Sequence, residues 1–387
     1  LLLDNITISS PQGMMAASFK AVFGEDSPEL SFGARVERMD TEAVKQLWPF
    51  WIARKPREWV SNNLHGGVVT DGDIAVFLPA GRLKGVGIPI NLDENELRIG
   101  FDIDDTRITL NDTFPDVNQS DAHVRIAGGR VTVDIDEGDI VVADGRTLKL
   151  DAGAFEIADA YEKPLTGAVD VALSGRVQDL LTLADAPPIN ALKGTEYAPD
   201  DFSGDGVVKV QASFPLEAGQ SSMPSDWHVE ADVSNGVIAK PVSGYNVDAL
   251  DGHLDIVPQR LVYKGRGAVD GIPIDIDWTQ PLGSPAKGST LVVAGTLDDT
   301  QRNILVPGLG NYVAGPMALT LNSADNVNTI SLDLTRSSLS LPWIGWAKPA
   351  GTEARLTFDS SSKDGVTSLK NLKLSGSGLT ASGEVTL

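Results

Sequence analysis

Strict alternation of apolar and polar residues recurs along most of this chain, from about residue 67 to its end. Successive side chains of a strand point to opposite sides, so this pattern predicts strands with one apolar and one polar face. About twenty such strands are predicted, and few helical segments are available to cover their apolar faces. The positions that we expect on the apolar face of three such runs are Leu97, Ile99, Phe101 and Ile103; Val131, Val133 and Ile135; and Ile272, Ile274 and Ile276.

Three segments break the alternation, and they resemble one another. Each runs from a strand through a glycine, at Gly33, Gly175 or Gly295, to an acidic helix start and later to a proline. We expect helices near 41–63 and 177–186, and a shorter one near 298–305. This is a degenerate repeat of many strands followed by a short helix. The segments expected from it are 1–66, with N-terminal strands and a Trp-rich helical part; 67–195 and 196–310, each a strand repeat ending in a helix; and 311–387, with further strands.

Turn dipeptides punctuate the strands and predict tight hairpins. They are Asp71-Gly72, Gly128-Gly129, Asp144-Gly145, Asn235-Gly236, Asp251-Gly252 and Asp364-Gly365. Such dipeptides between alternating runs favour two-residue hairpin loops, and hence an antiparallel meander. No alternation of strands with helices occurs, so Rossmann and TIM-barrel architectures are unfavoured.

Composition excludes several functions. The net charge of −22, from 31 basic and 53 acidic residues, argues against a nucleic-acid partner, which needs a basic face. The absence of cysteine excludes disulfides, thiolate metal sites and a cysteine nucleophile, and suits the bacterial periplasm. No apolar run is long enough for a membrane-spanning helix. Because the chain opens on Leu1 without an initiator methionine, we expect a fragment of a longer protein with any anchor outside it.

Motifs for catalysis are missing from the sequence. The four histidines lack ligand spacings, and no nucleophile elbow, P-loop or dinucleotide-binding glycine motif occurs. The acidic runs 102–105 and 134–139 alternate with isoleucine, which is typical of the polar face of a strand rather than of a calcium loop. We therefore expect no enzyme, no metal and no cofactor.

Aromatic residues cluster at two places. One group combines tryptophans with basic residues, and the other holds Trp343 and Trp346. Both are interpreted first as helices or turns that plug a sheet, and alternatively as contacts with lipid or a partner. The members of the first group are Trp48, Trp51, Trp59, Arg54 and Arg57.

Three patches carry a family resemblance. The first is Leu47-Trp48-Pro49 with Arg57-Glu58-Trp59-Val60 and Asn63-Leu64-His65-Gly66-Gly67; the second is 297–302 with 313–316; the third is 341–352. Together they resemble motifs of the AsmA-like envelope proteins of the YhdP type, from Gram-negative bacteria. These are similar to eukaryotic bridge-like lipid-transfer proteins.

The resemblance implies a fold and a role. The expected fold is mostly β: an elongated, twisted, curled antiparallel sheet that forms an open apolar groove, with a few short helices. The expected function is non-enzymatic transfer of phospholipid, whose acyl chains occupy the groove, between the inner and outer membranes. The protein would be periplasmic, held at the inner membrane by an anchor outside this chain, with envelope proteins as further partners. The alternative is a β-rich envelope scaffold or adhesin with a closed, side-chain-filled core.

Overall fold

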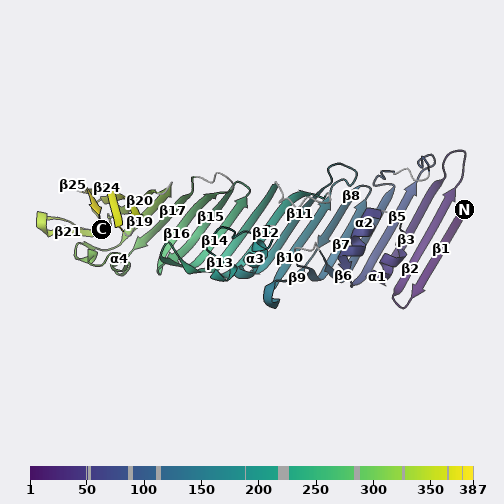
Figure 1. Ribbon diagram of the computed structural model, residues 1–387, viewed down its shortest axis with the longest axis horizontal. Helices are drawn as coiled ribbons and strands as arrows, with labels where there is room; N and C mark the ends of the chain where they lie inside the picture. The colour runs from purple at the N-terminus through teal and green to yellow at the C-terminus, as the bar shows by residue number, and fades with distance from the viewer. Residues whose placement is uncertain are drawn as a thin grey trace. The chain divides into compact units, whose positions relative to one another are not determined.

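The computed structural model describes most of the chain, and the account below refers to this part. Its ranges are 1–48, 50, 54–85, 90–109, 115–187, 189–216, 226–282, 288–324, 327–363, 366–376 and 378–386. The prediction of a mostly-β fold with a few short helices is confirmed. Of the strands, 22 form antiparallel sheet and three form a small separate sheet, accompanied by four α-helices (Figure 1).

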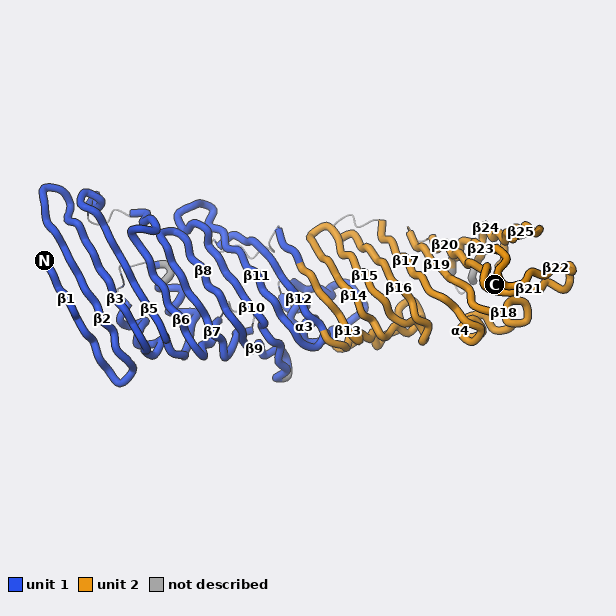
Figure 2. Tube along the Cα trace, turned by 180° about the vertical axis from the view of Figure 1, so that it is seen from behind, with its two compact units in different colours: residues 1–199, 206–228 blue, residues 200–205, 229–387 orange. Residues whose placement is uncertain are grey.

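The chain divides into two compact units (Figure 2). Unit 1 comprises Leu1–Pro199 and Gly206–His228, and unit 2 comprises Asp200–Asp205 and Val229–Leu387. The finer division into four segments stays a prediction.

Unit 1 is a meander of antiparallel strands with three helices. Its strands are β1 (Leu2–Ser10), β2 (Gly13–Val22), β3 (Glu29–Asp40), β4 (Leu64–His65), β5 (Val68–Leu78), β6 (Leu97–Ile108), β7 (Val117–Ala127), β8 (Arg130–Ile135), β9 (Gly138–Val141), β10 (Thr147–Ile157) and β11 (Thr166–Arg176), and its helices are α1 (Thr41–Leu47), α2 (Arg54–Asn63) and α3 (Val177–Asp185). Strand β12 (Phe202–Pro215) lies mostly in this unit.

Unit 2 continues the same construction with one helix. Its strands are β13 (Asp226–Val242), β14 (Tyr245–Val257), β15 (Arg260–Val269), β16 (Ile272–Pro281), β17 (Thr290–Leu297), β19 (Met317–Ala324), β20 (Val327–Asp333), β23 (Ala354–Lys363), β24 (Val366–Gly376) and β25 (Leu379–Thr386); β18 (Val313–Ala314), β21 (Ser338–Leu341) and β22 (Trp346–Lys348) form the small sheet, and α4 (Asp299–Leu305) follows β17.

Within each unit, strands pair with strands close to them in sequence. In unit 2, β13 pairs with β14, β14 with β15, β15 with β16, and β16 with β17, all antiparallel. For these strands of unit 2, the hydrogen-bonding partner is therefore the strand just before or after in the sequence.

The expected strand-to-helix breaks are present. Strand β3 leads into α1, β11 into α3 and β17 into α4. The Asp298 carboxylate accepts from the Gln301 N–H at 2.8 Å, and the Asp298 N–H donates to the Gln301 Oε1 at 3.0 Å, which makes a capping box. Asp40 precedes α1 but makes no such side-chain bond.

Three of the predicted hairpin turns are wrong. Asp71-Gly72, Asn235-Gly236 and Asp251-Gly252 lie inside β5, β13 and β14, not between strands. The pairing of β13 with β14 shifts register between Val233 and Gly236, and Asn235 has a φ of 52°. A β-bulge uses the same left-handed backbone that a hairpin turn requires, so the dipeptide predicts the conformation but not the turn.

Candidate functional site: an apolar sheet face

The register of the strands places the predicted lining residues of unit 1 on one face. Ile99 of β6 lies opposite Ile74 of β5 and Ile126 of β7, and Ile126 lies opposite Val131 of β8. A parallel row joins Phe101, Val124, Val133 and Phe155 across β6, β7, β8 and β10. We call this side of the sheet the apolar face. The remaining predicted members, Leu97, Ile103 and Ile135, also belong to it.

The apolar face of unit 2 is built in the same way. One cross-strand row consists of Ala231, Leu254, Tyr263, Trp278 and Leu291. A second row consists of Ile276, Val293, Leu321, Ile330 and Phe358. The predicted members Ile272 and Ile274 occupy the same face of β16. Apolar side chains thus continue from strand to strand without a convergent polar group in these rows.

The opposite side of the sheet, which we call the charged face, carries rows of charged side chains. The His123 Nδ1 atom lies 2.8 Å from an Asp102 carboxylate oxygen, and its Nε2 atom lies 3.1 Å from Asp136. These hydrogen bonds raise the pKa of the His123 imidazole. Arg125 adds an ion pair to Asp102 at 2.7 Å. Charged pairs directly opposite each other favour this register, because a slip by one residue would exchange the two faces.

Helices cover part of the apolar face in unit 1. Trp48, at the end of α1, is 4 % exposed and meets the Phe101 ring edge-on with centroids 5.9 Å apart. Leu97, Ile99 and Ile103 are also buried. A mostly apolar pocket of about 40 Å³ remains beside Trp48, which is room for only a few water molecules. Over β5 to β8 the face is therefore filled largely by side chains of the protein itself.

Towards β1 the apolar face of unit 1 is open. Leu3, Ile6 and Ile8 are exposed, although they lie opposite Phe19, Ala17 and Met15 in the apolar rows. These positions precede the region in which the alternation was recognised. The short alternating pair Ile6 and Ile8 is the signal that could have identified them.

A second partly open stretch lies in unit 2. Leu254, Trp278 and Val293 are only half-buried, and Ile276 is as well. Among the described hydrophobic residues between Leu173 and Ile272, Tyr263 is the one that is buried. The face from β13 to β17 thus has apolar rows but incomplete cover.

One tryptophan of the Trp-rich basic group packs on the sheet of unit 1, and one of its arginines is exposed. Trp59 of α2 stacks on Phe155 of β10, with ring centroids 6.4 Å apart and planes at 9°. Arg54 is exposed and pairs with Glu58 at 3.2 Å. Trp51 lies outside the described residues.

Arg57, unlike Arg54, turns toward α1. Its side chain is half-buried, and its Nε donates to the Trp48 carbonyl oxygen at 3.1 Å. A cation at this position donates to a carbonyl at the C-terminal end of α1. Arg57 therefore ties α2 to α1, which sequence spacing alone did not reveal.

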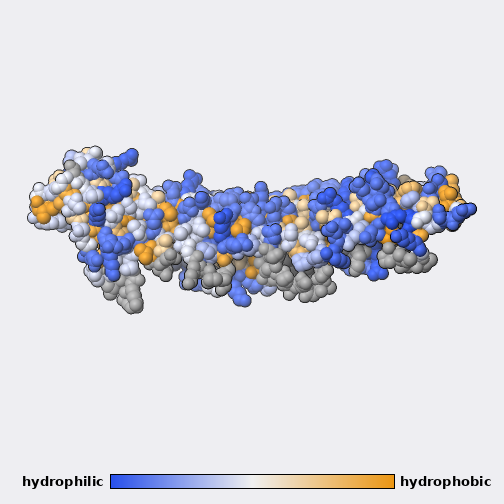
Figure 3. Space-filling model, turned by 90° about the horizontal axis from the view of Figure 1, so that it is seen from above, coloured by the Kyte–Doolittle hydropathy of each residue, from blue (hydrophilic) through white to orange (hydrophobic). Residues whose placement is uncertain are grey.

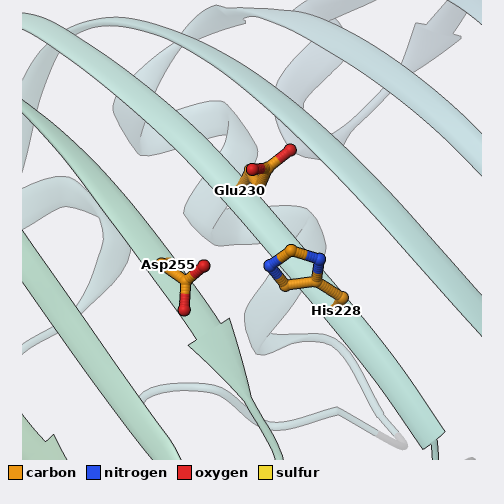
Figure 4. A group of neighbouring side chains, drawn as sticks. All are labelled: His228, Glu230 and Asp255. Carbon is orange, nitrogen blue, oxygen red and sulfur yellow. The ribbon is translucent and has the colours of Figure 1, made fainter.

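Two acidic side chains lie opposite each other on the charged face of unit 2 (Figure 4). Glu230 of β13 lies opposite Asp255 of β14. Like charges directly opposite each other destabilise a strand pair. Exposed acidic groups are common without a bound ion, so this pair is not assigned as a metal site.

Sequence reasoning missed the buried cations. The Lys45 Nζ donates to the Leu64 carbonyl oxygen and to Glu42, and Arg302 of α4 donates to the Gly315 carbonyl oxygen at 2.9 Å. Each cation joins a helix to the segment that follows it. Their spacing to these carbonyls spans more than ten residues, so no local motif marks them.

No protein-family model, no curated protein and no solved structure matches the chain. Across the part of the chain that the structure describes, none of the helices combines the length and apolarity needed to cross a bilayer.

Proposed function

We propose that this protein is a non-enzymatic lipid-transfer module that holds the acyl chains of phospholipids on its apolar sheet face. The observation that carries the proposal is the continuation of the apolar rows beyond the helices, over β1 to β3 and over β13 to β17. An exposed apolar face of this kind is uncommon in a protein that binds nothing.

The energetics suit transport along the face. Each CH₂ group buried contributes about 0.8 kcal/mol, so partial cover of two acyl chains is sufficient to retain a lipid. Successive rows in unit 2 offer similar aliphatic and aromatic contacts, such as those at Leu254 and Val293. Similar neighbouring positions let a lipid move without escaping a single deep site.

The proposal includes the cell compartment and the partners of the protein. The lipid would pass between the inner and outer membranes of a bacterial envelope, through a periplasm compatible with a cysteine-free chain. An inner-membrane anchor outside this chain and envelope proteins would be its partners.

One observation favours a second candidate. The apolar face under α1 and α2 is a filled core, with Trp48 and Phe101 in contact. A chain whose whole face were covered in this manner would be a structural envelope scaffold or adhesin rather than a carrier.

Adjacent valines of β17 separate the two candidates. Val293 lies on the apolar face opposite Ile276, whereas Val292 lies on the charged face opposite Asp277 and is 37 % exposed. The full chain, as wild type, V293D and V292D, would be extracted with organic solvent and the copurified phospholipid measured by mass spectrometry. Circular dichroism would report folding in parallel.

For a carrier, wild type and V292D retain phospholipid, and V293D stays folded but retains several-fold less, since an open face lets water reach the carboxylate. For a closed scaffold, wild type carries no phospholipid and V293D unfolds, because its charge is buried without a partner. Equal lipid content in V293D and V292D would contradict the assignment of the binding face.

A further inference from the structure

Three large side chains are exposed beside the small sheet of unit 2, one just before β18 and two in the turn after β21. Tyr312 is 40 % exposed, Trp343 66 % and Ile344 55 %. We call these three residues the aromatic tip. The space-filling view shows hydrophobic residues at the end of the unit that carries β21 (Figure 3).

The aromatic tip is held in place by local contacts. A 3₁₀ turn, η4 (Pro342–Ile344), begins with a proline and ends at Gly345, whose φ of 66° suits glycine. The rings of Tyr312 and Trp343 meet edge-on with centroids 5.1 Å apart. The Tyr312 carbonyl oxygen accepts from the Ser340 N–H at 2.9 Å. The exposed side chains therefore sit on a fixed support.

The base of the tip is packed and its cation is turned inward. Val313 and Leu339 are buried. The Lys348 Nζ is buried as well and donates to the Ser337 carbonyl oxygen at 2.6 Å and to that of Pro349 at 3.2 Å. Burial lowers the pKa of the Lys348 ammonium. The outer surface of the tip thus presents aromatic and aliphatic groups instead of this charge.

The sequence around the tip is free of acidic residues, in contrast to the rest of the chain. Residues 303–324 include no charged side chain, and residues 337–352 include only Lys348, in a protein with 53 acidic residues. The first stretch also exposes Ile304 and Val306 beside the end of α4. Because the segments that form the tip contribute no carboxylate, the tip can approach lipid phosphates with less repulsion than the acidic parts of this chain.

We propose that the aromatic tip docks into the interfacial layer of a phospholipid bilayer. Tryptophan and tyrosine favour this layer, because their rings are apolar and their N–H and O–H groups remain hydrated. Three projecting side chains are too few for a stable protein interface, which needs about 800 Å² from each partner. Shallow insertion into a bilayer requires no partner surface of matching shape.

Flotation with vesicles of pure phosphatidylcholine tests the docking. The full chain would be compared as wild type, as W343A/I344S and as F23A; Phe23 is exposed as well, but stands next to Glu25 and Asp26. Brominated phosphatidylcholine would report insertion by quenching tryptophan fluorescence, with W343F identifying the contribution of Trp343. I344E gives a second loss variant at an exposed position.

We expect wild type and F23A to float, and the vesicle-bound fraction of W343A/I344S and I344E to fall by about tenfold or more. V293D should float like wild type, because docking at the tip does not depend on lipid carried by the sheet face. Failure of wild type to float, or equal flotation of W343A/I344S, would overturn the docking. A dimer in sedimentation that W343A/I344S abolishes, without vesicle binding, would identify the tip as a protein interface instead.

Discussion

Replacing Trp48 by alanine tests whether α1 belongs to the core of unit 1. Trp48 is 4 % exposed and contacts Phe101, and its carbonyl oxygen accepts from Arg57. A buried tryptophan covers about 200 Å² of surface, or about 5 kcal/mol at 25 cal/mol per Å². Alanine keeps part of this, while the edge-on ring contact contributes about 1 kcal/mol more. We therefore expect W48A to lower the free energy of unfolding by about 4 kcal/mol.

The same substitution at Trp343 is the matched control. Trp343 is 66 % exposed and contacts Tyr312, so W343A should lower stability by about 1 kcal/mol or less. Urea unfolding followed by far-UV circular dichroism measures the free energy of unfolding of both variants. If two transitions are seen, each is analysed separately. A W48A protein whose free energy of unfolding is within about 1 kcal/mol of wild type would refute the packing of α1 on the sheet. Truncation of a buried tryptophan to alanine is expected to cost more than that.

Two further predictions concern charged groups. The bond to Asp102 raises the pKa of His123, so its contribution to stability is complete below its unfolded pKa of about 6.5 and is lost as the pH rises through the folded pKa. In urea unfolding between about pH 6 and about pH 9, the free energy of unfolding of wild type should decline in a way that H123Q lacks. Parallel pH curves for the two proteins would contradict this prediction. Arg302 is 1 % exposed and links Asp299 to the Gly315 carbonyl oxygen. R302A should therefore lower the free energy of unfolding of unit 2 by about 3 kcal/mol, which calorimetry can measure. An unchanged unfolding transition would contradict this linkage.

The faces of the strands could be predicted from the sequence because the side-chain period of a strand is two. Ile99 and Ile274 lie on the apolar face for that reason alone, whatever the neighbouring strands are. The strand-to-helix breaks after Gly33, Gly175 and Gly295 were also visible, since a change of period marks them.

The cover of those faces could not be predicted. Nothing near Phe101 in the sequence says that Trp48 lies on it, because this contact depends on how α1 folds back over strands that follow it. The inward side chain of Arg57 depends on the position of a carbonyl in another helix. Asn235 has a left-handed backbone, but whether it forms a bulge or a turn depends on the pairing of β13 with β14, which the dipeptide alone does not specify.

Pairing between strands close in sequence has a consequence for folding and for evolution. The hairpins of unit 2 from β13 to β16 each close only a short loop, so structure can nucleate at several places and grow strand by strand. A defect in one hairpin would then weaken its neighbours first and leave distant hairpins intact. Duplicating or deleting a pair of strands would preserve the alternation of faces, so the number of strands is a quantity that evolution can adjust without redesigning the core.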